Sequence, residues 1–424
     1  MTVFIETYGC QMNQSESFSL RSLLEDEGHK IVDCSDDADV IIINTCVVRK
    51  HAEDKIWSRL GSIPKEKKVF VTGCMAEQEK EELKRRFSVV KGVFGPQHLL
   101  ELPVYINKIE ECVKTGESDY KFPPAAIEKD NPFKGSITIS HGCSNFCSYC
   151  VVPFVRGKER SRKSSEIISE IKRLKDNGVT DILLLGQNVN SYGKDIGDIT
   201  FAELLYKINE IDGIKRIRFM TSHPKDFDDS LIEAVHYLPK VEKRVHLPIQ
   251  SGSDRILELM NRKYTLSQYI KLIEKIRLFN DDISVSTDIL CGFPGETEED
   301  HLATLKAMEE IRFDEAYMFA YSKRKNTAVY NLPDEPDEKT RKRRLKEVIS
   351  LQQKITSLSL KKLIGIKTEF LVEDISARNK NEWFGRTKAG RIAILPDFQN
   401  IKPGLYILCK VESVKGNSLF LKKE

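Results

Sequence analysis

Short apolar stretches alternate with longer amphipathic stretches through the first hundred residues of the chain. The apolar stretches have the length and continuous hydrophobicity of strands that are buried on both faces of a parallel sheet. They cover residues 3–7, 39–44, 68–72 and 89–94. Helical periodicity fills the intervals and covers residues 17–27, 50–60 and 77–87. This alternation predicts an open, doubly wound parallel sheet.

The alternation resumes after a polar segment at 116–133, whose Pro123-Pro124 pair is typical of a linker. Strands with helices between them are then expected at 136–141, 181–185, 215–220, 244–248, 283–289 and 315–320. Six such units predict an incomplete parallel barrel, because a closed barrel of this type has eight.

The pattern changes again near the end of the chain. Residues 340–364 are expected to form one long helix, and five short alternating strands follow Gly365. Five strands in this length predict a small β-barrel, a fold that binds oligonucleotides or docks other proteins. The fold class is therefore α/β with a separate all-β domain. The expected division is a domain at 1–115, a linker at 116–133, a (β/α)6 core at 134–360 and the small barrel at 361–424.

The composition is that of a globular protein without membrane spans. Of 424 residues, 40% are hydrophobic and 31% are charged, which is ordinary for a soluble domain. No apolar run reaches the roughly 20 residues of a membrane-spanning helix, and the first residues do not resemble a signal peptide. Ten cysteines are too few for a disulfide scaffold in a chain of this length. We therefore expect a cytoplasmic protein with no membrane partner.

Basic residues are concentrated in one segment. Between Ser322 and Ile364 the chain has 12 Lys or Arg and 5 Asp or Glu, a local charge of +7 in a chain whose net charge is +3. The densest run covers residues 339–346. Such a run is either a solvated helix face or a nucleic-acid contact. Its position beside a small barrel favours the second interpretation.

Cys143, Cys147 and Cys150 form the motif C-x3-C-x2-C. A four-iron cluster usually takes four thiolates, so three closely spaced thiolates leave one iron open for a small molecule. The amino and carboxylate groups of S-adenosylmethionine suit such an iron. A zinc site and three unconnected thiols are the alternatives, but zinc favours paired C-x2-C elements or several histidines, and only His141 is close. The motif therefore favours an iron–sulfur cluster at the carboxyl end of the first core strand, where barrel chemistry takes place.

Three more cysteines, Cys10, Cys46 and Cys74, each follow an expected strand of the first domain. Ligands bind outside the carboxyl ends of the strands in an open α/β sheet, so these thiols are expected to meet in one crevice. The alternative is three small buried side chains. Their placement on three strand ends favours a second iron–sulfur cluster. The remaining cysteines have no such spacing and are expected to be packing residues: Cys34, Cys112, Cys291 and Cys409.

With both cysteine sets placed, the chain resembles the radical S-adenosylmethionine methylthiotransferases over its whole length. One motif that carries the resemblance is Tyr8-Gly9-Cys10-Gln11-Met12-Asn13, and it favours the branch that acts on N6-(dimethylallyl)adenosine in tRNA. The other stretches are 44–49, 155–162, 186–192, 221–224, 246–253 and 292–297. The barrel, with Phe384-Gly385-Arg386-Thr387, resembles the TRAM domain of that family, an RNA-binding module. A departure at Lys325-Asn326, where relatives often have a Pro/Gly turn, concerns only local loop shape.

The resemblance implies a division of labour between two [4Fe-4S] clusters. Cys143, Cys147 and Cys150 would hold the cluster that cleaves S-adenosylmethionine, and the resulting radical would remove hydrogen from C2 of the adenine. Cys10, Cys46 and Cys74 would hold the auxiliary cluster that carries the sulfur. A second S-adenosylmethionine would methylate that sulfur, giving 2-methylthio-N6-(dimethylallyl)adenosine next to the anticodon.

The resemblance also implies contacts to the cofactor and to RNA. Residues expected near S-adenosylmethionine are Tyr149, Gly186, Gln187, Asn188, Gly292 and Gly295. Core packing or turn formation is the alternative for these. Residues expected to contact tRNA phosphates are Arg156, Arg160, Arg162, Arg341, Arg343, Arg344 and Arg386, with surface solvation as the alternative. His223 and His246 are expected to be structural polar residues at strand ends.

Two other functions stay open from the residues. One is an RNA-binding or redox-sensing protein whose clusters are structural, although such a cluster does not need an open iron. The other is the same enzyme class acting on threonylcarbamoyladenosine in tRNA or on an aspartate of a ribosomal protein. The expected partners are tRNA, an electron donor such as flavodoxin or ferredoxin, and sulfur and iron–sulfur assembly proteins, with the chain itself a monomer.

Overall fold

The computed structural model describes residues 1–424 except 48–49, 279–281, 334, 397–399 and 424. The chain divides into two compact units. Unit 1 contains residues 1–146, 150–199 and 324–326, and unit 2 contains residues 147–149, 200–323 and 327–424. The expected domain bounds are a different division of the same chain, and they stay a prediction.

Unit 1 begins with a six-stranded sheet in which every neighbouring pair is parallel, with the order β2-β1-β3-β4-β5-β6. Its strands are β1 (Thr2–Thr7), β2 (Lys30–Ile31), β3 (Val40–Thr45), β4 (Lys68–Gly73), β5 (Val90–Phe94) and β6 (Cys112–Lys114). The helices are α1 (Gln11–Asp26), α2 (Lys50–Ser62), α3 (Cys74–Glu79), α4 (Glu81–Arg86), the 3-10 helix η1 (Pro96–Glu101) and α5 (Leu102–Lys108). The predicted doubly wound sheet is confirmed.

One helix differs from the sequence prediction. The stretch 77–87 is not a single helix but parts of α3 and α4, which meet at Lys80. Lys80 has φ +46°, outside the range of a right-handed helix, and it serves as the C-cap of the first helix and the N-cap of the second. Both short helices still place Met75, Ala76 and Leu83 in the core.

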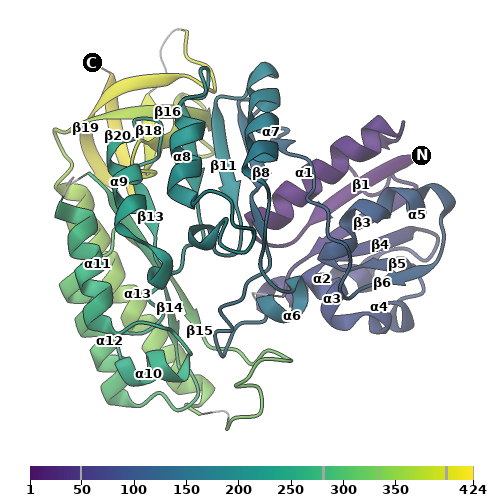
Figure 1. Ribbon diagram of the computed structural model, residues 1–424, viewed down its shortest axis with the longest axis horizontal. Coiled ribbons are helices and arrows are strands. Elements are labelled where there is room, and N and C mark those ends of the chain that lie inside the picture. Colours follow the sequence, from purple (N-terminus) through teal and green to yellow (C-terminus); the bar gives the residue numbers. More distant parts are fainter. Residues whose placement is uncertain (48–49, 279–281, 334, 397–399, 424) are drawn as a thin grey trace. The chain divides into compact units, whose positions relative to one another are not determined.

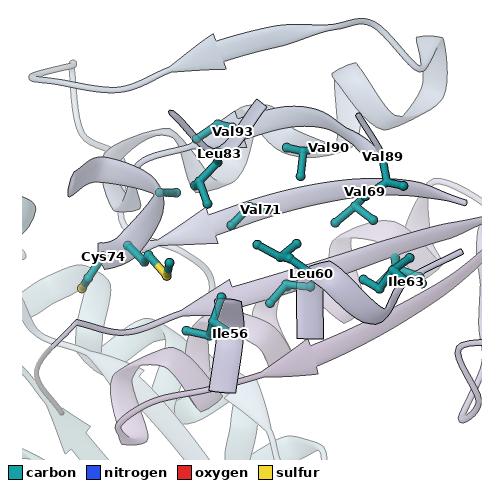
Figure 2. Close-up of a cluster of buried hydrophobic side chains, with 14 of the residues drawn as sticks. Ile56, Leu60, Ile63, Val69, Val71, Cys74, Leu83, Val89, Val90 and Val93 are labelled. Atoms are coloured by element: carbon teal, nitrogen blue, oxygen red, sulfur yellow. The ribbon is translucent and has the colours of Figure 1, made fainter. Parts of the chain in front are cut away.

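Side chains on the two faces of this sheet form two separate cores. Successive side chains of β3 point to opposite faces of the sheet. Ile41 and Ile43 therefore lie in one core, and Val40 and Ile42 lie in the other. Figure 2 shows the first core, in which β4 and β5 side chains pack against α2 and α4 and Cys74 lies at one end. Because both faces are covered, β1, β3, β4 and β5 are largely apolar, and the sequence pattern identified these four strands.

The remainder of unit 1 is built around two parallel strands, β8 (Lys134–Thr138) and β11 (Asp181–Leu185), with β7 (Ala126–Ile127) antiparallel to β8. The expected strand 136–141 is interrupted at Ile139, and its end is a separate strand β9 (Ser140–His141) paired with β10 (Arg160–Ser161). The helices are α6 (Val152–Arg156), α7 (Ser164–Asp176) and the 3-10 helix η2 (Val189–Ser191).

The polar segment expected to be a linker, residues 116–133, lies within unit 1. The Ser118 amide donates to Gln97 Oε1 at 3.1 Å, and the Ala125 amide donates to Glu170 Oε2 at 2.6 Å. The ring of Tyr120 stacks on His141 with 4.0 Å between the ring centroids. These contacts hold Ser118, Tyr120 and Ala125 against other parts of unit 1, and the linker assignment stays a prediction.

Unit 2 contains the strands β12 (Arg216–Phe219), β13 (Arg244–His246), β14 (Ser284–Cys291) and β15 (Glu315–Ala320). β13, β14 and β15 form a parallel sheet in that order. Figure 1 shows α11 (Leu266–Leu278), α12 (Glu298–Ile311) and α13 (Glu338–Lys361) along this sheet. The other helices are α8 (Phe201–Asn209), the 3-10 helix η3 (Pro224–Asp226), α9 (Asp229–Tyr237) and α10 (Asp254–Leu259).

The end of the chain is a closed five-stranded barrel with the order β16-β17-β18-β20-β19, drawn in yellow tones in Figure 1. Its strands are β16 (Lys367–Ile375), β17 (Glu382–Thr387), β18 (Ile392–Pro396), β19 (Tyr406–Lys415) and β20 (Ser418–Lys423). Phe370, Val372, Leu395 and Cys409 are among its buried core. The predicted small barrel is confirmed. No helix in the described parts of the chain is long and apolar enough to cross a membrane.

Candidate functional site

Cys10, Cys46 and Cys74 lie at the carboxyl ends of three neighbouring parallel strands. Cys10 is the N-cap of α1 after β1, Cys46 directly follows β3, and Cys74 is the first residue of α3 after β4. The strands pair in the order β1-β3-β4. The three thiols are therefore on one edge of the sheet, where open α/β folds bind their ligands.

Close backbone packing holds these strand ends together. A Cβ added at Gly9 would lie 2.9 Å from the Cys46 Cβ, so only glycine lets the two segments approach this far. The Asn13 side-chain Nδ2 donates to Asn44 Oδ1 at 2.9 Å, and the Asn44 side-chain Nδ2 donates to the main-chain carbonyl of Asn13 at 2.9 Å. This reciprocal pair ties the first turn of α1 to the end of β3. The two asparagines are thus structural supports of the cysteine set, a role that their motifs alone did not reveal.

The three thiols differ in exposure. Cys10 is exposed, whereas Cys46 and Cys74 are buried. Burial raises the pKa of the Cys74 thiol to about 12, while the nearby Arg156 acts in the opposite direction. A metal would supply the charge that a thiolate in this position needs.

Arg156, at the end of α6, is buried and paired with Glu16 of α1. Its Nη1 and Nη2 donate to the two Glu16 carboxylate oxygens at 2.6 and 3.2 Å. Both side chains are 3% exposed. The resemblance placed Arg156 at tRNA phosphates, but a guanidinium that is buried and held by both oxygens of a carboxylate has no free face for a phosphate. We therefore assign Arg156 to the interior of unit 1.

The donor set of each cysteine triad fits an iron–sulfur cluster better than a single ion. No group of three or more His, Cys, Asp or Glu within the described residues is spaced for one metal ion. A cluster of several irons spreads its thiolates around a larger body, and its ligands are cysteines. The chemistry of both sets, three thiols and no carboxylate or imidazole among them, agrees with that requirement.

The loop that carries the C-x3-C-x2-C motif is anchored in unit 1 at its start. Gly142 has φ +77°, and a Cβ there would lie 2.1 Å from the Lys158 carbonyl oxygen, so the position requires glycine. The Cys143 amide donates to the Gly157 carbonyl at 3.1 Å. Gln187, two residues beyond β11, accepts from the Gly142 amide at 2.5 Å through its Oε1. Gln187 therefore supports the motif loop in this structure. Its expected contact with the cofactor stays a prediction.

The middle of the motif, residues 147–149, belongs to unit 2. The Ser148 amide donates to the Met260 carbonyl at 3.1 Å, and its hydroxyl donates to the Leu259 carbonyl at 2.8 Å. The Tyr149 ring meets the Phe293 ring edge-on, with 6.5 Å between the centroids. A contact between Tyr149 and the adenine of S-adenosylmethionine stays a prediction.

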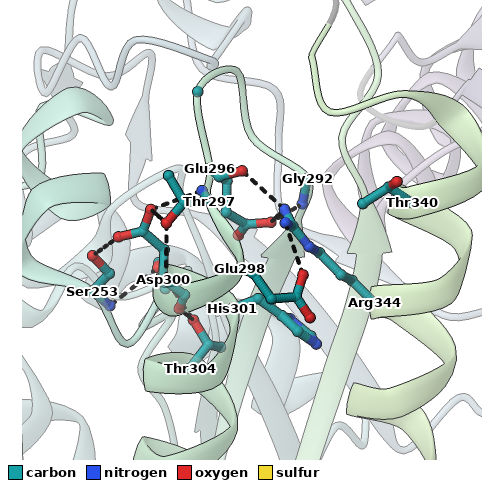
Figure 3. A network of polar contacts seen from close by, with 12 residues as sticks. Ser253, Gly292, Glu296, Thr297, Glu298, Asp300, His301, Thr304, Thr340 and Arg344 are labelled. Atoms are coloured by element: carbon teal, nitrogen blue, oxygen red, sulfur yellow. Dashed lines mark hydrogen bonds and ion pairs between the residues drawn. The ribbon is translucent and has the colours of Figure 1, made fainter.

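The Gly292–Gly295 turn is bonded to the side chain of Glu296, which in turn pairs with Arg344 of the basic helix α13 (Figure 3). Glu296 Oε2 accepts from the Gly292 amide at 2.7 Å and from Arg344 Nη1 at 2.8 Å. A Cβ at Gly292, where φ is +74°, would lie 2.2 Å from Arg341 Cγ. The turn expected near the cofactor is thus held by residues that the sequence assigned to RNA.

Most of the arginines assigned to RNA are engaged within the protein. Arg162 is buried and pairs with Glu170 at 2.7 Å, and Arg341 and Arg344 are also buried. Arg343, about half exposed, pairs with Glu298 at 2.6 Å and with Glu347. Arg162 and Arg344 pair with carboxylates inside the protein, and Arg341 is buried. Little of their surface is left for a phosphate, and their contacts with tRNA stay predictions.

Arg160 and Arg386, like the half-exposed Arg343, keep part of their surface. Arg160 Nη1 donates to the Ser118 carbonyl at 3.0 Å. Arg386 Nε lies 3.6 Å from Glu373 Oε1, and 31% of its side chain is exposed. Contacts of Arg160, Arg343 and Arg386 with tRNA stay predictions.

The remaining candidates have local partners. His223 Nδ1 accepts from the Lys225 amide at 3.3 Å. His246 Nδ1 lies 3.1 Å from Ser286 Oγ, and His246 Nε2 lies 3.4 Å from Asp288 Oδ2. Cys291 and Cys409 are buried and Cys112 is partly buried, as expected of packing residues. Cys34 is exposed, so its expected packing role is wrong.

Sequence reasoning missed Arg262, which lies between α10 and α11. Its Nη1 lies 3.4 Å from the sulfur of Cys147, and the residue is 7% exposed. The motif is defined by the spacing of its thiols, and nothing in the local sequence marks an arginine 115 residues further on as a neighbour.

Comparisons with known proteins agree with these observations. Residues 2–95 match the model of the uncharacterized protein family UPF0004, and residues 137–308 match that of the Radical SAM superfamily. A tRNA-2-methylthio-N(6)-dimethylallyladenosine synthase of Thermoanaerobacter pseudethanolicus is 44% identical over 92% of this chain and 85% of its own length. The enzyme of that name from Clostridium beijerinckii is 41% identical over 99% of this chain and 94% of its own length.

A solved structure shows the same fold at low identity. It is the radical S-adenosylmethionine methyltransferase TsrM from Kitasatospora setae, described with cobalamin and a [4Fe-4S] cluster bound. The TM-score is 0.55 at 15% identity, over 78% of this chain and 74% of that one. This likeness confirms the predicted fold class. From the extent and identity of the sequence matches, the chain belongs to the family of the tRNA-2-methylthio-N(6)-dimethylallyladenosine synthases.

Proposed function

We propose that this protein is a methylthiotransferase that modifies C2 of N6-(dimethylallyl)adenosine next to the anticodon of tRNA. The observation that carries the proposal is the pair of cysteine triads in a chain 44% identical to a synthase of that name. One triad follows three neighbouring strands of a parallel sheet, and the other occupies a single anchored loop.

The two triads have separate roles in this proposal. Cys143, Cys147 and Cys150 hold a [4Fe-4S] cluster that supplies the electron for cleavage of S-adenosylmethionine. Cys10, Cys46 and Cys74 hold the second cluster, at which sulfur is made available. The protein supplies binding and orientation: the Asn13–Asn44 pair fixes the second site, and Gln187 fixes the start of the motif loop.

S-adenosylmethionine is proposed to contact residues of the motif loop and further residues of each unit. The proposed contacts in unit 1 are Gly186 and Asn188, which follow β11. The proposed contacts in unit 2 are Tyr149 and the Gly292–Gly295 turn. Main-chain atoms at glycines approach a ligand closely, because no Cβ intervenes. The Glu296 side chain keeps the Gly292 amide occupied, so the turn is shaped before any ligand binds.

The tRNA is proposed to bind through phosphate contacts on the barrel and on the exposed side of α13. Arg386 of β17 retains partial exposure, and Lys339, Lys342 and Lys346 of α13 are exposed. Arg160 of β10, in unit 1, also retains partial exposure and is a further proposed contact. Phosphate contacts of this kind position an RNA without reading its sequence. We propose the cytoplasm as the location of the reaction, because tRNA is found there and thiols stay reduced there. A flavodoxin or ferredoxin is the proposed electron donor, and iron–sulfur assembly proteins are the proposed source of the clusters.

The experiment that tests this division uses single-site variants of the reconstituted protein. Cys10→Ala is expected to abolish methylthiolated product and to leave reductive cleavage of S-adenosylmethionine intact. Cys143→Ala is expected to abolish both. Cleavage and product are measured in the same anaerobic reaction, by the 5′-deoxyadenosine released and by nucleoside analysis of the tRNA. Loss of cleavage in Cys10→Ala, with the motif-loop cluster still assembled, would contradict the assigned roles.

The substrate is tested in the same assay. Parallel reactions contain tRNA with N6-(dimethylallyl)adenosine, tRNA with threonylcarbamoyladenosine, or unmodified tRNA. We expect product only with the first. Product only with the second would assign the chain to the other tRNA substrate.

A further inference from the structure

Arg262 contacts a cysteine of the motif loop from inside unit 2. Its Nη1 lies 3.4 Å from the Cys147 sulfur, which is within hydrogen-bond range for a sulfur acceptor. Only 7% of the residue is exposed. A charge this deeply buried is poorly screened by salt and interacts more strongly with its neighbours than a surface charge.

The rest of the guanidinium is held by two other groups. Nε donates to the Tyr264 hydroxyl at 3.0 Å, and Nη2 donates to the Pro248 carbonyl at 2.8 Å. The Tyr264 hydroxyl donates to the Ile249 carbonyl at 2.9 Å. The guanidinium carbon Cζ of Arg262 lies 5.2 Å from the centroid of the Tyr264 ring. These bonds fix the orientation of the planar Arg262 guanidinium, and in that orientation its Nη1 donates to the Cys147 sulfur.

The thiol is held from its own side as well. Ser148, the next residue, is bonded through its amide to Met260 and through its hydroxyl to Leu259, at the end of α10. The Ser148 carbonyl accepts from the Val329 amide at 3.3 Å. Arg262 follows the same helix end, and its amide donates to the Leu257 carbonyl at 2.8 Å. The sulfur and the guanidinium are thus fixed to one short stretch of backbone.

We propose that Arg262 is a positioning residue that raises the reduction potential of the cluster on Cys143, Cys147 and Cys150. Hydrogen bonds to the sulfurs are among the features that set the potential of an iron–sulfur cluster. Reduction by a one-electron donor adds one electron and one negative charge to the cluster, and no bond forms or breaks. A fixed positive N–H at a ligand sulfur stabilises the product of that step more than the reactant. The proposal rests on the assignment of Cys147 as a cluster ligand.

The test measures the midpoint potential of this cluster alone. Cys10, Cys46 and Cys74 are replaced by Ala so that one cluster remains, and the potential is followed by electron paramagnetic resonance during titration with dithionite. Arg262→Gln removes the positive charge. Arg262→Lys keeps the charge but loses the planar guanidinium and its several N–H donors. Arg277→Gln is the matched control, because the Arg277 guanidinium also donates to main-chain carbonyls, those of Ile311 and Arg312, and has no contact with a thiol in the part of the chain described.

We expect Arg262→Gln to lower the equilibrium constant for reduction at least tenfold, which corresponds to about 59 mV for one electron. Arg262→Lys is expected to give a smaller decrease, and Arg277→Gln is expected to match the parent protein. Wild-type potentials in both Arg262 variants would overturn the proposal, and so would an equal decrease in the control. If Arg262→Gln does not retain the cluster, Arg262→Lys decides alone.

A separate variant distinguishes failure of this proposal from failure of the assigned function. Cys147→Ala in the same background is expected to lose the cluster. If it does, and the Arg262 variants have wild-type potentials, the ligand assignment stands and the tuning role is wrong. If Cys147→Ala retains a wild-type cluster, the ligand assignment itself is wrong.

Discussion

Arg344 of the basic helix α13 forms a buried ion pair with Glu296, the residue that follows the Gly292–Gly295 turn. The Arg344 Nη1 to Glu296 Oε2 distance is 2.8 Å, and the two side chains are 4% and 2% exposed. The same carboxylate oxygen accepts from the Gly292 amide. The helix that leads to the barrel is therefore fixed to the turn proposed to approach S-adenosylmethionine.

Removing one member of this pair is expected to affect both stability and cofactor binding. Arg344→Met leaves the Glu296 carboxylate buried without its cation, which costs about 3–5 kcal/mol for a buried pair. We expect a lower unfolding midpoint in urea and weaker binding of S-adenosylmethionine in a calorimetric titration. Fluorescence of Trp383, in a Trp57→Phe background, reports on unit 2 because the chain has only these two tryptophans.

Arg343→Gln is the matched control for that variant. Arg343 also pairs with Glu298 but is 45% exposed, so its loss is expected to cost less than about 1 kcal/mol. Equal destabilisation by the two variants would mean that burial of the Arg344 pair has no special effect.

The Arg156–Glu16 pair gives a second stability prediction, for unit 1. Arg156→Met is expected to lower the free energy of unfolding by about 3–5 kcal/mol, because Glu16 is left buried and unpaired. Urea unfolding followed by Trp57 fluorescence, in a Trp383→Phe background, measures it. Arg21→Gln is the control: it breaks the partly exposed Arg21–Glu25 pair on α1, the helix that carries Glu16. This variant is expected to cost about 0.5 kcal/mol or less. A loss below 1 kcal/mol for Arg156→Met would contradict the internal role of this residue.

Iron content tests whether the two cysteine triads are independent cluster sites. The anaerobically reconstituted protein is expected to bind about eight irons, as two four-iron clusters. Replacement of either triad by Ala is expected to leave about four, since the two sets lie on different elements. Colorimetric iron and sulfide analysis, with parallel electron paramagnetic resonance spectra, measures the remainder. An unchanged iron content in either triple variant would refute that site.

Much of this arrangement follows from patterns that are local in sequence. Each buried parallel strand is a continuous apolar run, so β1, β3, β4 and β5 were predicted, and with them the edge on which Cys10, Cys46 and Cys74 lie. The two-residue strand β2 and the three-residue strand β6 are too short to show a period. The motif loop was recognised because the spacing of its three cysteines is itself the signal.

The roles of charged side chains depended on contacts between distant segments. Arg341 and Arg344 belong to a run that is typical of nucleic-acid contact, yet their partners are 49 and 48 residues away, at Gly292 and Glu296. Arg262 was missed for the same reason. Composition alone does not distinguish an arginine that pairs inside a protein from one that faces solvent, because burial is decided by tertiary packing.

The exposed lysines of α13 give a corrected prediction for tRNA binding. Replacing Lys339, Lys342 and Lys346 by Gln is expected to weaken binding and to lower the slope of log affinity against log salt by about 0.9 for each lost phosphate contact. Filter binding at several salt concentrations measures the slope. Lys271→Gln, an exposed lysine on α11, is the control and is expected to leave the slope unchanged. An identical slope in the triple variant would mean that this side of the helix is only solvated.

The central claim is tested most directly by following the methyl group of S-adenosylmethionine into tRNA. Purified, reconstituted protein is incubated anaerobically with a one-electron reductant, methyl-labelled S-adenosylmethionine and tRNA that carries N6-(dimethylallyl)adenosine, and the nucleosides are analysed by mass spectrometry. We predict one new nucleoside, 2-methylthio-N6-(dimethylallyl)adenosine with the labelled methyl group, and none with the Cys10→Ala or Cys143→Ala protein. Release of 5′-deoxyadenosine without any labelled nucleoside from the fully loaded wild-type protein would contradict the proposed function.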